Sequence, residues 1–401
     1  MDALCNARVF TGDSVLDDRV VLIEDGRIVD LVAATAIPPL AIRYDLGGDL
    51  LAPGFIDLQV NGGGGVLFND QPTPAGLRVL AAAHRRFGTT GFLATLISDD
   101  RDHRRAARAA VLAGLSHDPV PGLLGLHLEG PHLATVRRGV HDLRYLGPPE
   151  AEDVALMMPL SQGPLNLGAM LVTLAPEVVP AAVITALSAA GTRVFLGHSA
   201  ADYDQTQAAL AAGACGFTHL YNAMTPISGR EPGVAGAALD HPDSWCGIIA
   251  DGHHLHDALI RLAWRAKPAG RLVLVTDAMS PVGGPVGQDY FSLYGQTVRV
   301  EGGRCLSVEG RLAGSVLDMA GAVRHCVQRV GIPLEEALRM ASAYPAAALG
   351  LDGDYGQIAP GKIASLVLLD QGLRVRLTWL AGNISSLKRL CGVPSWVSTP
   401  C

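Results

Sequence analysis

Lysine is scarce in this chain of 401 residues, because only three of its 31 basic residues are Lys and the others are Arg. The 38 acidic residues outnumber the basic ones, the formal net charge is −7, and no block of Lys or Arg is present. Nucleic-acid binding requires clustered positive charge. The composition therefore argues against a nucleic-acid partner, and a site for an anionic ligand should be local.

Long apolar runs are also missing, although 49% of the residues are hydrophobic and 17% are charged. A membrane-spanning helix needs about 18 uninterrupted apolar residues, and Pro, Gly, Arg or Asp interrupts every candidate. We therefore expect no membrane partner. The first six residues show neither the basic nor the apolar segment of a secretory signal, so the expected location is the cytoplasm.

The seven cysteines are scattered, odd in number and never spaced as Cys-x-x-Cys. This pattern favours free buried thiols over a disulfide framework or a thiolate zinc site.

The two ends of the chain have short β patterns. Residues 20–24 and 27–29 flank Asp25-Gly26, which predicts a hairpin. Residues 356–358 and 363–369 are predicted to be strands. Because isolated hairpins are only marginally stable, we expect residues 1–52 and 345–401 to form one small β-sandwich domain.

Between the ends, a unit repeats in which a short apolar strand ends at a polar or Gly-rich turn and an Ala/Leu-rich helix pattern follows. Alternating strands and helices require right-handed crossovers and a parallel sheet. Eight such units predict a (β/α)8 TIM barrel over residues 53–344, with a doubly wound open sheet as the alternative. The predicted strands are 55–61, 91–96, 123–129, 168–174, 193–198, 216–219, 246–251 and 272–277.

Helices are predicted at 74–87, 102–115, 177–190, 202–212 and 256–266, whereas the stretches after residues 130 and 220 are expected to be loops. Residues 285–315 are expected to form a hairpin insertion after the eighth strand, and residues 62–65 a tight loop.

Four polar residues stand at the carboxyl ends of predicted strands: Glu129, His198, His219 and Asp277. Barrel enzymes place their active sites at this face. Two imidazoles and a carboxylate suit Zn²⁺ or Fe²⁺ and leave a coordination position for water, and an aspartate opposite suits a general base. A single strand-end histidine is usually structural, so the signal lies in the four residues together.

Several motifs give the chain a more specific resemblance. They are Pro-Gly-Phe-Ile-Asp-Leu-Gln-Val-Asn-Gly at 53–62, His-Leu-Glu-Gly-Pro at 127–131, Thr-His-Leu-Tyr-Asn-Ala-Met at 218–224, Gly-Arg-Glu-Pro-Gly at 229–233, Asp-Gly-His-His at 251–254 and Leu-Ala-Gly-Ser at 312–315. With these motifs, the sequence resembles the N-acetylglucosamine-6-phosphate deacetylase family of the amidohydrolase superfamily from about residue 20 to 370.

The resemblance implies one divalent metal per chain, Zn²⁺ or Fe²⁺, held by Glu129, His198 and His219. Metal-bound hydroxide would attack the acetamide of N-acetyl-D-glucosamine 6-phosphate. Asp277 would take the proton from the water and deliver it to the amine, and His141 would stabilise the charge that develops on the acetamide oxygen.

The resemblance also implies a site for a phosphorylated N-acetyl amino sugar, formed by Val140, Asn222, Ala223, Arg230 and His254. In relatives this phosphate site borrows a residue from a neighbouring subunit, so a homodimer with a shared phosphate site is implied.

One departure from the superfamily concerns the number of metals. Many amidohydrolases have His-x-His at the end of the first strand and bind two ions, whereas this chain has Gln59 and Asn61. Neutral amides are poor ligands for zinc-like ions, so a single metal is expected, with Gln59 near its water.

Three alternatives remain open. The substrate could be the galactosamine epimer. Gly-His-Ser-Ala-Ala at 197–201 approaches a serine-hydrolase elbow centred on Ser199, although Ala201 replaces the final glycine. The third alternative is a sugar-phosphate sensor without turnover, which would require a broken ligand set.

Three further patterns are interpreted as structural. Gly-x-x-x-x-Gly-Lys at 356–362 lacks the Ser or Thr of a P-loop, because Ile363 follows. His253 and His256 are expected to be loop or helix-start residues. His127 should lie on the same side of its strand as Glu129 and serve the core or the surroundings of the site.

Overall fold

The computed structural model describes residues 1–160 and 168–385. They divide into two compact units. One unit comprises residues 57–83 and 92–318, and the other comprises residues 1–56, 84–91 and the described residues from 319 onward.

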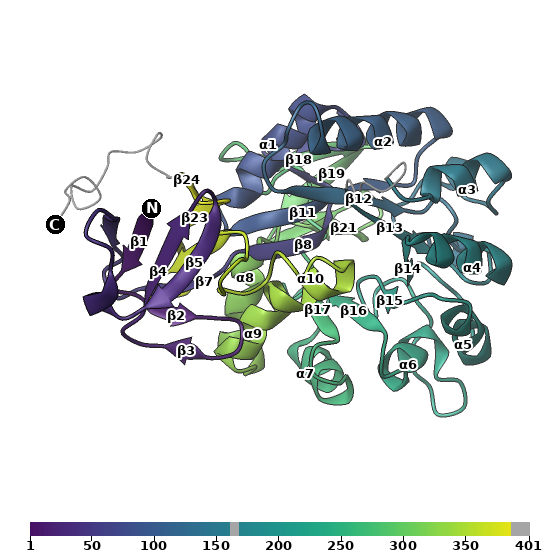
Figure 1. The fold of residues 1–401 in the computed structure, drawn as a ribbon. Coiled ribbons are helices and arrows are strands. Elements are labelled where there is room, and N and C mark those ends of the chain that lie inside the picture. Colours follow the sequence, from purple (N-terminus) through teal and green to yellow (C-terminus); the bar gives the residue numbers. More distant parts are fainter. Residues whose placement is uncertain (161–167, 386–401) are drawn as a thin grey trace. The chain divides into compact units, whose positions relative to one another are not determined.

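A parallel sheet of eight strands dominates the chain, and neighbouring strands follow the order of the sequence (Figure 1). Each strand lies where a strand was predicted, and the barrel prediction is confirmed. The strands are β8 (Phe55–Val60), β11 (Thr89–Ile97), β12 (Leu123–Glu129), β13 (Ala169–Leu174), β14 (Arg193–Leu196), β15 (Gly216–Phe217), β16 (Trp245–Ile248) and β17 (Leu272–Leu274).

The sheet approaches closure where its first strand meets the end of its last. Val60 forms a parallel bridge with Ala278. Just before it, the buried carboxylate of Asp57 accepts the N–H of Gln59 at 3.1 Å, the N–H of Thr276 at 3.2 Å and the hydroxyl of Thr276 at 2.5 Å. Burial raises the pKa of Asp57 to about 7. Asp57 thus joins β8 to the segment after β17.

Helices separate most of the strands, and five of them lie at the predicted positions. The helices are α1 (Pro74–Arg85), α2 (Arg101–Leu115), α3 (Ala151–Met157), α4 (Ala181–Ala190), α5 (Tyr203–Ala211), α6 (Gly233–Asp240) and α7 (Asp257–Ala266). The short helices α3 and α6 end two stretches that were predicted to be loops. Gly233 and Gly236 weaken the helix signal of α6, since glycine is a poor helix former.

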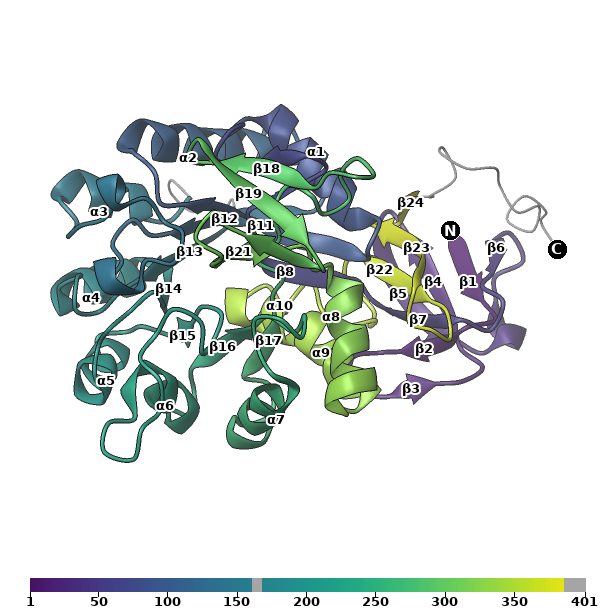
Figure 2. The same ribbon diagram turned by 180° about the vertical axis from the view of Figure 1, so that it is seen from behind.

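The insertion after the eighth strand is larger than the predicted hairpin. It is an antiparallel sheet of four strands (Figure 2), namely β18 (Tyr290–Leu293), β19 (Gln296–Glu301), β20 (Arg304–Leu306) and β21 (Leu312–Ser315). Gly302 and Gly303 have φ of 57° and 79°, which permits the tight turn between β19 and β20. The inner face packs Leu293, Val298 and Cys305 into one apolar cluster.

A small hairpin follows β8, formed by β9 (Gly62–Gly63) and β10 (Val66–Leu67). Gly64 and Gly65 between them have φ of 66° and 89°. The glycines therefore serve a tight turn, as predicted.

The two ends of the chain build two sheets in the other unit. The six-stranded sheet has the order β24 (Asn383–Ser385), β23 (Val375–Leu380), β22 (Leu366–Leu369), β7 (Leu50–Pro53), β2 (Arg8–Phe10), β3 (Val15–Leu16). The four-stranded sheet has the order β5 (Arg27–Val32), β4 (Val20–Glu24), β1 (Asp2–Cys5), β6 (Ile42–Asp45). Leu4 and Val21 of the second sheet share one buried core with Leu51, Leu366 and Trp379 of the first. This is the predicted β-sandwich from both ends.

The same unit contains α8 (Met319–His325), a π-helical turn (Cys326–Val330), α9 (Leu334–Ala341) and α10 (Ala343–Leu349). No helix of the described residues is long and apolar enough to cross a membrane.

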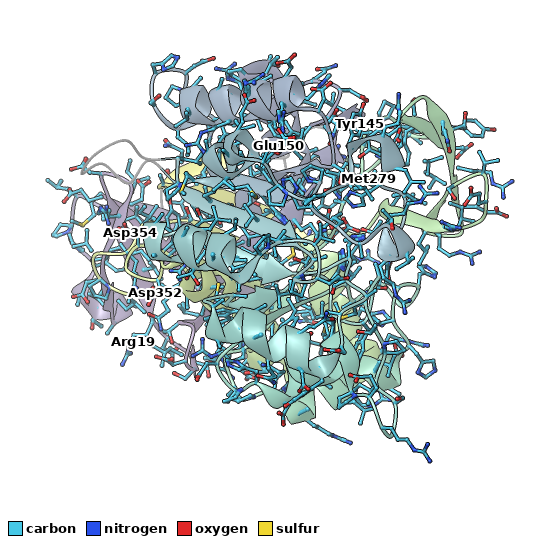
Figure 3. The ribbon with its side chains drawn as sticks, turned by 90° about the vertical axis from the view of Figure 1, so that its right-hand side faces the viewer. Arg19, Tyr145, Glu150, Met279, Asp352 and Asp354 are labelled. Carbon is cyan, nitrogen blue, oxygen red and sulfur yellow. The ribbon has the colours of Figure 1, made fainter. Side chains whose placement is uncertain are left out.

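The predicted strand at 356–358 is wrong, because Gly356 has a φ of 87° and lies in a turn. The segment that resembled a P-loop is instead held by the acidic loop after α10, where Asp352 and Asp354 lie (Figure 3). The Lys362 ammonium donates to the carbonyl of Asp352, and Arg27 donates to Asp354 and Gly361. The role of the segment at 356–362 is therefore structural, as interpreted from the sequence.

None of the five cysteines in the described part of the chain forms a disulfide, and three of them are buried; Cys391 and Cys401 lie outside the described residues.

Candidate active site

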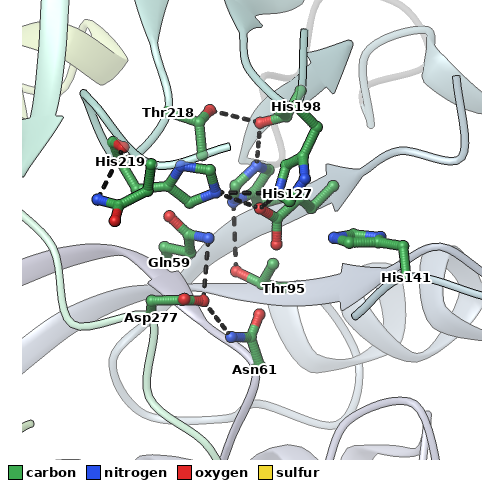
Figure 4. Close-up of polar contacts among 12 residues, drawn as sticks. Gln59, Asn61, Thr95, His127, His141, His198, Thr218, His219 and Asp277 are labelled. Atoms are coloured by element: carbon green, nitrogen blue, oxygen red, sulfur yellow. Dashed lines mark hydrogen bonds and ion pairs between the residues drawn. The ribbon is translucent and has the colours of Figure 1, made fainter. Parts of the chain in front are cut away.

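Three predicted metal ligands meet at the carboxyl ends of the barrel strands, and two of them, His198 and His219, are labelled in Figure 4. Glu129 ends β12, His198 follows β14 and His219 follows β15. Glu129 Oε1 lies 2.9 Å from His219 Nε2 and 3.2 Å from His198 Nε2, and the two Nε2 atoms are 3.1 Å apart. All three side chains are buried. Three ligand atoms therefore point at one position.

The chemistry of these atoms fits a divalent ion. His198 Nδ1 lies 2.9 Å from the carbonyl of Arg137, which only accepts, so Nδ1 carries the proton and Nε2 presents its lone pair. Burial pushes the pKa of Glu129 upward, but its close contacts with the imidazoles of His198 and His219 hold that pKa well below its ordinary value. Imidazole nitrogen and carboxylate oxygen are ligands of Zn²⁺ and Fe²⁺.

Backbone strain is concentrated at the same strand ends. His198, His219 and Asp277 have φ of 48°, 33° and 52°, in the left-handed region that non-glycine residues rarely adopt. Each such residue costs on the order of 1–3 kcal/mol and persists only where its surroundings enforce it. Strain of this kind clusters at functional sites.

Asp277 lies in the same pocket, held by two amides. Gln59 Nε2 donates to Asp277 Oδ1 at 3.0 Å, and Asn61 Nδ2 donates to the same oxygen at 2.6 Å (Figure 4). Asp277 Oδ2 accepts no hydrogen bond from the described residues. Burial, and then the charge of Glu129, raise the pKa of Asp277 to about 6. Gln59 was expected near the water of the metal; its amide contacts Asp277, and Asn61 was not predicted as a site residue.

His141 has a defined tautomer. Its Nδ1 accepts the N–H of Ser98 at 3.3 Å and faces the Ser98 hydroxyl at 2.6 Å. Burial lowers the pKa of His141 to about 3, so the ring is neutral and carries its proton on Nε2. Tyr294, in the insertion, donates from its hydroxyl to the Ser98 carbonyl at 2.5 Å. Neither Ser98 nor Tyr294 was predicted, because each contact joins residues that lie far apart in the sequence.

One pocket of about 300 Å³ is lined by Glu129, His141, His198, His219 and Asp277. Of the predicted substrate residues, it includes Val140, Asn222, Ala223 and His254. Residues that were not predicted as part of the site also line it: Asn61, Ile97, Val136, Arg137, Gly139, Ile249, Met279, Leu312 and Gly314. The motif at 312–315 was a signal for the last two, since it was among the segments that carry the resemblance.

The partly buried Asp251 orients His254. Asp251 Oδ2 lies 2.7 Å from His254 Nδ1, and Asp251 Oδ1 accepts the N–H groups of His253 and His254 at 2.8 Å each. Because the carboxylate accepts the proton of Nδ1, His254 Nε2 is the atom left for a ligand. His256 begins α7 by accepting the N–H of Ala258, and His253 is exposed, in keeping with their structural interpretation.

Arg230 is not brought to this pocket. It is exposed on the loop before α6 and is not a lining residue. Glu231 holds that loop, because its carboxylate accepts the N–H groups of Tyr203 and Gly233 at 2.8 Å each. A role of Arg230 in the pocket of its own chain therefore has no support from this geometry.

His127 is a core residue and is not part of the pocket lining. Its Nε2 lies 2.7 Å from Thr173 Oγ1, its Nδ1 lies 3.1 Å from the carbonyl of Leu58, and burial lowers its pKa to about 4.

Ser199 does not have the surroundings of a nucleophile. Its hydroxyl donates to Glu177 at 2.7 Å and accepts the N–H of Ala201 at 3.0 Å, and no histidine of the described residues contacts it. A serine nucleophile needs an adjacent base that takes its proton, so the serine-hydrolase alternative loses its support.

A parallel barrel whose strand ends gather two histidines, a glutamate and an aspartate is the architecture of a metal-dependent hydrolase. Comparison with known proteins agrees. Residues 50–389 match the amidohydrolase family, and residues 1–51 match the NagA composite domain. The chain belongs to the amidohydrolase family.

The named relatives indicate which members of the amidohydrolase family this chain is similar to. The chain is 42% identical to N-acetylgalactosamine-6-phosphate deacetylase of Shewanella sp. over 94% of both proteins. It is 35% identical to N-acetylglucosamine-6-phosphate deacetylase of Haemophilus influenzae over 95% of this chain and 98% of that protein. The crystal structure of N-acetylglucosamine-6-phosphate deacetylase from Pasteurella multocida superimposes with a TM-score of 0.91 at 36% identity, covering 96% of this chain and 99% of that one.

Proposed function

We propose that this protein hydrolyses the acetamide of N-acetyl-D-glucosamine 6-phosphate to D-glucosamine 6-phosphate and acetate. The observation that carries the proposal is the convergence of Glu129, His198 and His219 in a pocket that also contains Asp277 and His141. The named relatives support the same reaction class.

Glu129, His198 and His219 would hold one divalent ion per chain, Zn²⁺ or Fe²⁺. Such an ion, when bound, lowers the pKa of water toward about 7 and polarises a carbonyl group. Asp277, whose Oδ1 is occupied by two amide donors, would take the proton of the attacking water at Oδ2 and pass it to the departing amine. His141 would donate its Nε2 proton to the acetamide oxygen as negative charge develops there.

The sugar phosphate would be held by the main chain at Val140 and Ala223 and by the side chains of Asn222 and His254. Arg230, exposed and outside the pocket of its own chain, would reach a phosphate only from a second copy. We therefore infer a homodimer in which each subunit lends Arg230 to its partner. Since sugar phosphates are charged and are retained inside cells, the enzyme would act in the cytoplasm.

The galactosamine epimer is a second candidate substrate, and one observation favours it. The relative with 42% identity is named for that epimer, whereas the relative named for the glucosamine form quoted above has 35% identity. The two sugars differ at one hydroxyl, and the active-site chemistry derived above applies equally to both.

One assay tests the reaction and the epimer preference. Acetate release is measured with each epimeric sugar 6-phosphate, with and without chelator, followed by addition of Zn²⁺ or Fe²⁺. The proposal expects metal-dependent release with a higher kcat/KM for the glucosamine epimer. A higher value for the galactosamine epimer would reassign the substrate, and chelator-insensitive release would overturn the metal-dependent mechanism.

A further inference from the structure

The charge of the pocket is unbalanced for a phosphorylated ligand. Its lining includes the carboxylates of Glu129 and Asp277, and Arg137 is the only lysine or arginine among the described residues that line it. The divalent ion proposed above would offset these two carboxylates, so the two negative charges of a phosphate dianion that enters the pocket still require a cation of their own. Arg137 is the cation that the chain itself places there.

The Arg137 guanidinium is available to a ligand. It is half-buried, and it makes no hydrogen bond or ion pair with another side chain of the described residues. Its neighbour Arg138 behaves differently, because Arg138 Nη1 donates to the carbonyl of His141 at 3.0 Å. The guanidinium of Arg104 is likewise committed, to Asp153 at 2.7 Å. Arg137 therefore differs from these two arginines, which serve the fold.

The main chain fixes where Arg137 stands. Its carbonyl accepts the Nδ1 proton of His198 at 2.9 Å, and Ala134 N–H donates to the His198 carbonyl at 2.9 Å. Ser199 N–H in turn donates to the carbonyl of Ala223 at 3.0 Å. The turn at Thr135–Arg137 is thus linked through His198 and Ser199 to Ala223, one of the residues proposed to hold the sugar phosphate.

We propose that Arg137 binds the phosphate group of the substrate from within the same subunit. This inference rests on the proposed function and assigns the anion contact a residue additional to those given above. A guanidinium stays charged at all physiological pH values and presents paired N–H groups that match two phosphate oxygens. Each pocket would then hold a cation of its own before a second subunit contributes Arg230.

The test compares Arg137→Gln, Arg137→Lys and the control Arg105→Gln, which removes an arginine on α2 that pairs with Asp102 and Glu152 outside the pocket. The ratio of kcat/KM for phosphorylated over unphosphorylated N-acetylglucosamine is measured for each. Loss of a charge-assisted hydrogen bond predicts that this ratio falls about 10- to 100-fold in Arg137→Gln. Arg137→Lys should recover part of it, and the control should match the wild type.

Inorganic phosphate provides a second readout that does not require turnover. Its dissociation constant, measured by calorimetry on the metal-loaded protein, should rise in Arg137→Gln by a factor similar to the fall in the ratio. The metal content of that variant should equal that of the wild type, because the Arg137 carbonyl that orients His198 remains.

An unchanged substrate ratio together with unchanged phosphate affinity would overturn the assignment. An equal loss of activity with both sugars would also overturn it and would make Arg137 a structural residue of the loop. If the wild type released acetate from neither sugar phosphate, the proposed function would fail, and the phosphate affinity would still decide whether Arg137 binds an anion.

Discussion

Substitution of Asn61 tests how the site controls the pKa of its proposed general base, Asp277. Asn61→Ala removes the shorter of the two amide hydrogen bonds to Asp277 Oδ1, the one at 2.6 Å. The side-chain oxygen of Asn61, Oδ1, is buried and has no hydrogen-bond partner among the described residues. The substitution therefore leaves no polar group of Asn61 itself unpaired, and we expect it to lower the free energy of unfolding by no more than the lost hydrogen bond contributes, about 1.5–3 kcal/mol.

The size of the expected shift in the pKa of Asp277 follows from the strength of the lost hydrogen bond. A bond to a charged group contributes about 1.5–3 kcal/mol, and one pKa unit corresponds to about 1.36 kcal/mol. An amide N–H stabilises the ionised form of Asp277, so its removal raises the pKa of Asp277 by roughly 1–2 units. The base acts when ionised, so activity is lost from the acidic side, and the acid limb of the kcat profile moves to higher pH.

The assay is acetate release as a function of pH on metal-loaded enzyme. Asn69→Ala serves as a control, because Asn69 is also a buried amide but donates to the Ile97 carbonyl and to Asp99 instead of Asp277. We expect a shifted acid limb in Asn61→Ala only. If Asn61→Ala keeps the wild-type limb and kcat, the amide does not control Asp277.

Three further substitutions test other parts of the account. Asp277→Asn should lower kcat by about 10²-fold or more while metal content and melting temperature stay near wild type, and loss of metal would instead mark Asp277 as a ligand. Asp153→Asn should destabilise the fold by roughly 3–5 kcal/mol in urea melts, since it leaves the buried Arg104 guanidinium without its carboxylate. Hydrogen bonds from Arg101 hold the pKa of Asp153 well below its ordinary value. The stabilisation by the Asp153 carboxylate is therefore present above about pH 4 and is lost as the pH falls. A variant whose stability has the same acid sensitivity as that of the wild type would refute this role of Asp153. Lys267→Met should lower the free energy of unfolding by about 1–3 kcal/mol, because Lys267 donates to two carbonyls and a hydroxyl around the end of α6. An unchanged melting curve would contradict that role.

The barrel could be predicted because its strands carry a local signal. Each is a short apolar run that ends in a polar or glycine-rich turn, and the strand pattern survives even where the following helix is weak. The helices α3 and α6 escaped prediction because each follows a long loop, and α6 also contains glycine. The strand predicted at 356–358 failed because Gly356 adopts a positive φ that the apolar pattern does not reveal.

Part of the site could also be predicted, because some of its residues stand at the ends of these strands. Glu129, His198, His219 and Asp277 stand at strand ends, so parallel-sheet topology alone brings them to one face. Residues that act through orientation were not predictable in this way. Ser98 contacts His141 across 43 positions of sequence, and Asn61 contacts Asp277 across 216. Such pairings depend on side-chain directions that spacing does not encode.

The most direct test of the central claim is a metal analysis of purified protein combined with the anomalous scattering of its crystals. The account predicts one equivalent of Zn²⁺ or Fe²⁺ per chain, bound at Glu129, His198 and His219, and lost together with acetate release in His198→Ala. Two equivalents that are both needed for turnover, or an ion bound elsewhere while His198→Ala remains active, would contradict it.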